Sequence, residues 1–336
     1  MLPLLARASS LSWLLLPVCA QQAAHAPPAT GDSTRIVLHE SAAIDLYFHV
    51  RAMAGGSASP GEAFAPAVEA ARELYGALGR NALALGAIEG LLPGCRTAAD
   101  VATAFGRAPE TVELRGGAKA PLRAGAAKLA QALVAAEPHF EALWKEHARI
   151  IADGRARWNE RVGAREAELL AFHLASLGMR DPGLAIPVYL MAEAPWPGAV
   201  THLDEEGRGV CFVAVKGEEG SQLLETVLHE VTHALDVASD EWVLNDLRGA
   251  LAAAGIGRRD AAFRDLPHTL MFVQAAESIR RIVAPEHRDY GDVSGYYGRA
   301  PESELVRGFW RDHLEGKLSR AEAIAGIVAG HEPAPR

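Results

Sequence analysis

The chain has 336 residues, of which 49% are hydrophobic and 22% charged, and its formal net charge is -9 at pH 7. This composition is typical of a globular protein with a sizeable core, and the negative charge argues against a nucleic acid as partner. After the N-terminal segment, no stretch of the sequence is long and apolar enough to cross a membrane, so we expect no transmembrane segment.

The N-terminus is typical of a signal peptide over residues 1–20. Arg7 supplies a positive charge, residues 11–18 form an apolar stretch, and Val18-Cys19-Ala20 resembles a small-residue cleavage site. Cys19 raises lipoprotein anchoring as an alternative, although the residues before it fit the usual lipidation pattern poorly. Residues 21–35, rich in Ala and Pro, indicate a disordered leader. We therefore expect an exported protein, either periplasmic or secreted.

Two cysteines, Cys95 and Cys211, are left once the signal peptide is removed. An oxidising compartment permits a disulfide between them, but sequence alone does not say whether they are close in space. Cys211 falls within a predicted strand, which favours its packing as a small apolar residue.

Residues 36–180 form a region whose pattern is almost wholly helical, interrupted by Gly-rich and Pro-containing breaks. The sequence does not indicate a function for this region. Asp45 and His49 are four residues apart on its first helix, a spacing typical of a surface contact, although the pair could also reach a cleft. The expected helices cover residues 42–53, 61–78, 97–105, 126–136, 138–151 and 155–176.

Residues 181–336 change character. The β-branched runs at 185–191 and 210–215 predict strands joined by a turn-rich loop. Helices follow, near residues 223–236, 242–254, 270–283 and 302–314. This order predicts a mainly helical α+β fold, in which a small antiparallel sheet lies next to the helix at 223–236. We also expect the strand at 210–215 to offer a free edge to an extended substrate.

The helix at 223–236 carries the most informative motif of the chain, His229-Glu230-Val-Thr-His233. Apolar residues recur around it at three- and four-residue steps and give the helix a buried face. Two histidines four residues apart lie on one helix face, so both imidazoles can bind one metal ion. The intervening glutamate can then act as general base on a water molecule, as in zinc peptidases.

The run His-Glu-Val-Thr-His-Ala-Leu resembles the active-site helix of the thermolysin-like gluzincin metallopeptidases. The extended pattern of the metzincins is absent, because positions 236 and 239 are Asp and Ser. The resemblance covers the motif helix and the order of elements after it, and it does not extend to the N-terminal helical region. It implies a Zn²⁺ cofactor and a third ligand that is a glutamate on a later helix.

Two downstream glutamates compete for the place of this third ligand. Glu277 lies on a strongly apolar helix beside Ala275 and Ala276, where a buried carboxylate needs a counter-charge such as zinc. Glu304 is the rival, in a more highly charged context that also resembles a glutamate helix of some gluzincins. We predict His229, His233 and Glu277 as metal ligands, with Glu304 as the alternative.

Peptide hydrolysis also needs a donor that stabilises the developing oxyanion. His268, Tyr296 and Tyr297 are the candidates, and we predict His268 and Tyr297 as catalytic together with Glu230. Asp236 is a candidate for orienting a zinc ligand.

The sequence thus predicts an exported zinc peptidase that acts on peptides or proteins. Two alternatives stay open: a catalytically inactive zinc-binding or scaffold protein, and a metal-dependent hydrolase of non-peptide amides.

Overall fold

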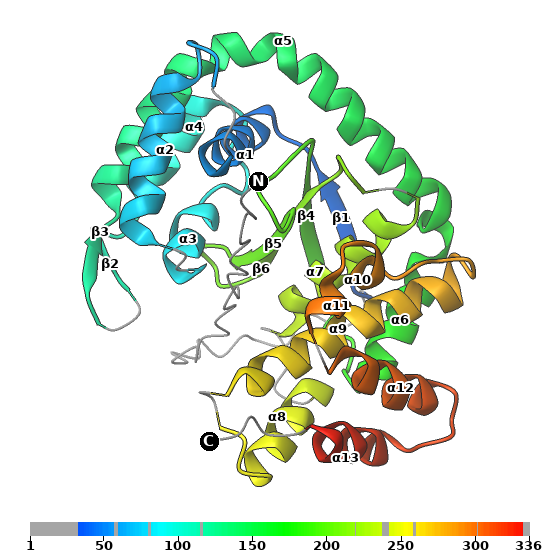
Figure 1. The fold of residues 1–336 in the computed structure, drawn as a ribbon. Helices are drawn as coiled ribbons and strands as arrows, with labels where there is room; N and C mark the ends of the chain where they lie inside the picture. Colours follow the sequence, from blue (N-terminus) through cyan, green and yellow to red (C-terminus); the bar gives the residue numbers. More distant parts are fainter. Residues whose placement is uncertain are drawn as a thin grey trace, which may run out of the picture.

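The protein is described here by a computed structural model that covers residues 33–56, 60–79, 82–114, 117–218, 220–236, 242–257, 260–300 and 302–331 (Figure 1). The predicted signal peptide and most of the predicted leader lie outside the described residues. Within the described part of the chain, no helix is long and apolar enough to span a membrane. The fold is mainly helical with a small sheet, which confirms the predicted α+β class.

The main sheet has four strands in the order β1-β4-β6-β5. Strands β1 (Arg35–His39), β4 (Ala185–Met191) and β6 (Gly209–Ala214) are parallel, and β5 (Ala199–Leu203) pairs antiparallel with β6. The strands nearest the motif helix are therefore antiparallel, as expected, but they belong to a larger mixed sheet. Because β6 has a partner on each side, the expectation that it offers a free edge is wrong. The outer strand on that side is β5.

Both faces of the sheet are buried, and each packs against its own hydrophobic core. Side chains alternate along a strand, so Val188 and Leu190 of β4 enter one core while Tyr189 and Met191 enter the other. The sheet consequently lies between two groups of helices (Figure 1). This double burial is why β4 and β6 read as nearly continuous apolar runs.

The N-terminal helices form the first group, and α5 is its longest member (Figure 1). We expected breaks near residue 137 and residue 153, but α5 runs unbroken for 39 residues. It continues through Pro138 because buried residues on both sides, such as Ala136 and Phe140, keep it packed on one core. The elements of this part of the chain are α1 (Ala42–Gly55), α2 (Ala65–Leu78), α3 (Ala82–Glu89), α4 (Ala98–Gly106), the hairpin β2 (Thr111–Glu113) and β3 (Lys119–Pro121), α5 (Arg123–Arg161), the 3-10 turn η1 (Gly163–Arg165) and α6 (Glu166–Leu177).

The second group covers the opposite face and includes the motif helix, and α6 packs with this group against α9. Its main difference from expectation is α9, which begins nine residues before the predicted start and contains Pro267. Asp260 caps this helix by accepting a hydrogen bond from the Ala262 amide at 2.9 Å, and His268 is thereby placed inside a helix. The helices are α7 (Gln222–Asp236), α8 (Val243–Ala253), α9 (Ala261–Ile282), α10 (Tyr290–Val293), α11 (Tyr296–Arg299), α12 (Ser303–Leu314) and α13 (Arg320–Gly330).

Candidate metal centre and active site

Helix α7 carries the histidine motif through the interior of the protein. Twelve of its 15 residues are buried, and the helix packs against β5, β6 and α9. His229 and Glu230 are therefore polar groups held inside a core, where each needs a partner to offset its lost hydration. A motif that arose by chance on a surface helix would not show this burial.

Three histidines come together where α7 packs against α9. The Nε2 atoms of His229 and His233 are 3.2 Å apart, and α9 brings His268 to them, so that one ring nitrogen of each lies within 4.8 Å of the others. Two nitrogens bound to one tetrahedral zinc, each at about 2.05 Å from it, would be roughly 3.3 Å apart. The spacing of the α7 pair is therefore that of a metal-binding pair.

The protonation states of these rings also fit a cation. Burial lowers the pKa of His233 to about 3 and that of His268 to about 4, and it holds the pKa of His229 well below its usual value. All three are therefore neutral imidazoles near pH 7, the form that ligates metals. Nδ1 of His229 is buried and has no hydrogen-bond partner in the described part of the chain. Three neutral rings that face one another at this distance form a donor set suited to a divalent cation.

Glu230 follows His229 on α7 and is held by the sheet. Its carboxylate accepts a hydrogen bond from the Thr201 hydroxyl at 2.7 Å, which ties the candidate base to the outer strand β5. Burial raises the pKa of Glu230 to about 7. A carboxylate with a pKa near the working pH is suited to take up and return a proton. No sequence pattern pointed to Thr201.

A buried network of hydrogen bonds fixes α7 against α9. His173 of α6 contacts Thr232 Oγ1 at 2.8 Å through Nε2 and Ser278 Oγ at 3.0 Å through Nδ1. Thr232 and Ser278 also donate to the carbonyls of Leu228 and Gln274, one turn earlier in their own helices, so both hydroxyls are held within the network. Burial lowers the pKa of His173 to about 3, which keeps the ring neutral. The network positions the two helices that supply the three histidines, and no motif in the sequence identified it.

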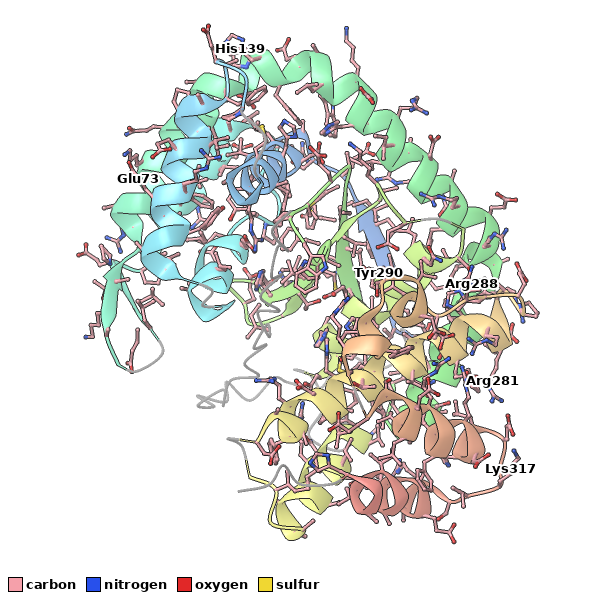
Figure 2. All side chains as sticks on the ribbon, viewed as in Figure 1. Glu73, His139, Arg281, Arg288, Tyr290 and Lys317 are labelled. Carbon is pink, nitrogen blue, oxygen red and sulfur yellow. The ribbon has the colours of Figure 1, made fainter. Side chains whose placement is uncertain are left out.

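Aromatic side chains form one wall of the centre. Phe272 stacks on His229 with ring centroids 3.8 Å apart, and the Tyr296 hydroxyl lies 3.4 Å from His268 Nδ1. Burial, together with the nearby carboxylates, raises the pKa of Tyr290 to about 12, and Glu230 is among those carboxylates. Tyr290 is the first residue of α10 (Figure 2). Burial also raises the pKa of Tyr296 to about 12, so both tyrosines keep their protons at neutral pH and can donate hydrogen bonds.

Glu277, the predicted third ligand, is not part of the histidine cluster. It lies nine residues after His268, about 13 Å further along the same helix. Its carboxylate accepts hydrogen bonds from Arg280, Arg281 and Arg311, and Arg281 lies near the end of α9 (Figure 2). Burial alone raises the pKa of Glu277, but these arginines outweigh it and leave the pKa below its usual value. The buried carboxylate does have the counter-charge that we expected, and guanidinium groups supply it.

The other residues predicted from the sequence have partners of their own outside the histidine cluster, except for Tyr296. Glu304 is 79% exposed and pairs with Arg307. Tyr297 is buried under the guanidinium of Arg307, 4.8 Å from its ring, whereas its neighbour Tyr296 contacts His268. Asp236 pairs with Arg248 at 3.4 Å. Of the predicted residues, the structure thus brings together His229, Glu230, His233 and His268, with Tyr296 beside them.

Cys95 and Cys211 are both free and buried, so the structure contains no disulfide between them. Cys211 lies in β6, as expected, and the Thr201 hydroxyl is 3.5 Å from its sulfur.

In comparisons with family models, curated proteins and solved structures, nothing matches this chain. The resemblance to gluzincins therefore rests on the motif helix and the order of elements after it, and the chemistry of the site follows from its own geometry.

Proposed function

We propose that this protein is a zinc-dependent hydrolase of peptide bonds in which His229, His233 and His268 hold the metal and Glu230 is the general base. The convergence of His268 on the two motif histidines, beside a buried glutamate, carries the proposal. Three protein ligands leave one position for water and substrate, as in catalytic zinc sites. A histidine as third ligand departs from the gluzincin pattern, so we propose a three-histidine site rather than membership of that clan.

Zinc, when bound, supplies a Lewis acid that polarises the substrate carbonyl and makes water nucleophilic at neutral pH. Glu230 then accepts the proton of the attacking water and passes it to the leaving amine, a role that its pKa of about 7 favours. Thr201 holds the carboxylate in place through its 2.7 Å hydrogen bond. The hydroxyl of Tyr296, 3.4 Å from His268 Nδ1, is the donor that we propose for the developing oxyanion.

The position of β5 favours a peptide as substrate. Its outer edge pairs with no strand in the described part of the chain, and its Thr201 touches Glu230. An extended peptide that added to this edge would pass beside the candidate base, with main-chain hydrogen bonds that tolerate many sequences. Gly90 approaches the Leu203 carbonyl closely, which closes the far end of the strand.

The test combines zinc content with cleavage of a mixed peptide library by the purified chain. We expect zinc in the wild type and in Glu230→Gln, with cleavage reduced at least about 100-fold in Glu230→Gln because the general base is lost. Glu160→Gln, at an exposed glutamate of α5, is the matched control and should cleave as the wild type does. Undiminished cleavage by Glu230→Gln, or a zinc-free wild type that still cleaves, would refute the proposal.

A further inference from the structure

A second group of metal-ligating side chains lies in the N-terminal part of the fold, apart from the histidine centre. His49 of α1, His147 of α5 and Glu193, which follows β4, each offer one ligand atom within 4.8 Å of the others. Their side chains are 13%, 9% and 26% exposed, so the group is sheltered but open to solvent on one side. Three elements far apart in the sequence thus place two imidazoles and one carboxylate together. Helix α5 runs over α1 at this part of the fold (Figure 1).

His147 is held in the orientation that a metal ligand needs. Its Nδ1 donates to the carboxylate of Asp45 at 2.6 Å, and the other oxygen of Asp45 accepts from the Ala192 amide at 2.7 Å. Asp45 is almost fully buried, so this contact is fixed. A carboxylate that holds one ring nitrogen leaves Nε2 with its lone pair for a cation, which is the arrangement found behind many metal-binding histidines.

His49 completes the donor set together with Glu193. Its Nδ1 contacts the Glu193 carboxylate, and its ring centroid is 5.4 Å from that of His147. A simple ion pair between His49 and Glu193 would not require a second, separately oriented imidazole at this distance. Two histidines and one carboxylate are a common ligand set for zinc and other divalent transition metals.

We propose that His49, His147 and Glu193 form a second site for a divalent transition-metal ion, with Asp45 as the positioning residue of His147. The site would join α1, α5 and the segment after β4, and metal bound there would stabilise the fold. The proposal is independent of the histidine centre on α7. Lys216 lies 3.5 Å from the Glu193 carboxylate, but its side chain is exposed and can turn into solvent when a cation binds.

Zinc bound per full-length chain, measured by elemental analysis after dialysis, tests this site. We expect about two zinc ions in the wild type and about one in His49→Ala and in Glu193→Gln. Glu193→Gln serves as a second variant because it keeps the shape of the side chain and disturbs packing least. His233→Ala should also bind about one, which then belongs to the second site. If the α7 centre binds no zinc but the second site does, the wild type will bind one zinc ion. His233→Ala will keep this ion, and His49→Ala will lose it.

Two controls separate loss of a ligand from general damage. His139→Ala removes an exposed histidine from the same helix α5 (Figure 2) and should keep both zinc ions. Lys216→Ala removes a neighbour of Glu193 that is not a ligand, and it should also keep both. The proposal is overturned if His49→Ala and Glu193→Gln bind as much zinc as the wild type. Loss of zinc from either control would overturn the assignment as well, because it would show that any change nearby releases the metal.

Discussion

Replacing Glu277 by Gln distinguishes most sharply between the ligand set expected from sequence and the three-histidine set proposed from the structure. The Glu277 side chain is 5% exposed and accepts hydrogen bonds from three arginines whose side chains are 25–35% exposed. Gln keeps the shape of the side chain but removes its charge. Three guanidinium groups then lose their common partner, and Asp289 is the buried carboxylate left to Arg280 and Arg311.

The size of the effect follows from this burial. Removing one partner of a buried ion pair lowers the free energy of unfolding by about 3–5 kcal/mol. Because the arginines are partly exposed and can be hydrated again, we expect the lower end, about 3 kcal/mol, which for a chain of this length lowers the melting temperature by about 4 °C. Zinc bound at the α7 centre should be unchanged, since Glu277 lies on another turn of α9.

Thermal unfolding of the chelator-treated protein measures this loss without any contribution from metal, and zinc content of the untreated variant is measured in parallel. Glu304→Gln is the matched control: it removes the other glutamate considered from sequence, which is 79% exposed and should contribute less than about 1 kcal/mol. Should Glu277→Gln lose the zinc while its metal-free stability stays unchanged, Glu277 would be the ligand and the reasoning from the structure would be refuted.

Three further changes probe the site. His268→Ala should lose zinc from the α7 centre by elemental analysis, whereas retention of that zinc would exclude His268 as a ligand. Tyr296→Phe should keep zinc and lower kcat about 100-fold if its hydroxyl stabilises the oxyanion, and an unchanged kcat would remove it from that role. His173 has a folded-state pKa of about 3, below its usual 6.5, so the stability from its neutral form is fully present above pH 6.5 and declines as pH falls. Between pH 6.5 and 5 we expect the unfolding free energy of the wild type to fall by about 2 kcal/mol more than that of His173→Gln in chelator, and equal slopes would contradict this.

The part of the site that the sequence predicted is the part set by local spacing. His229, Glu230 and His233 lie within one helix, where a four-residue separation determines a shared face. His268 comes 35 residues after His233, and its approach depends on how α9 packs against α7. The helix was expected to begin near residue 270, so His268 was expected before its start rather than inside α9. For Glu277 the physical rule, that a buried carboxylate needs a cation, was correct, but no local pattern says which cation it meets.

In the sheet, too, the strands with a clear local pattern were predicted, and those that depend on distant partners were missed. Strands β4 and β6 were predicted because their apolar runs are long and continuous. Strand β1 was missed because its five residues stand next to helices, and its partner β4 is about 150 residues away. Strand β5 is short and lies inside a polar, turn-rich segment. Without β5, the sequence placed the open edge on β6, although β6 is paired on both sides.

The most direct test is X-ray absorption at the zinc edge, recorded on His49→Ala loaded with one zinc per chain so that only the α7 centre is occupied. We expect three imidazole nitrogens and one further light ligand at about 2.0–2.1 Å. Two imidazoles with a carboxylate would contradict the assignment of His268, and an inability to load zinc at all would contradict the metal centre itself.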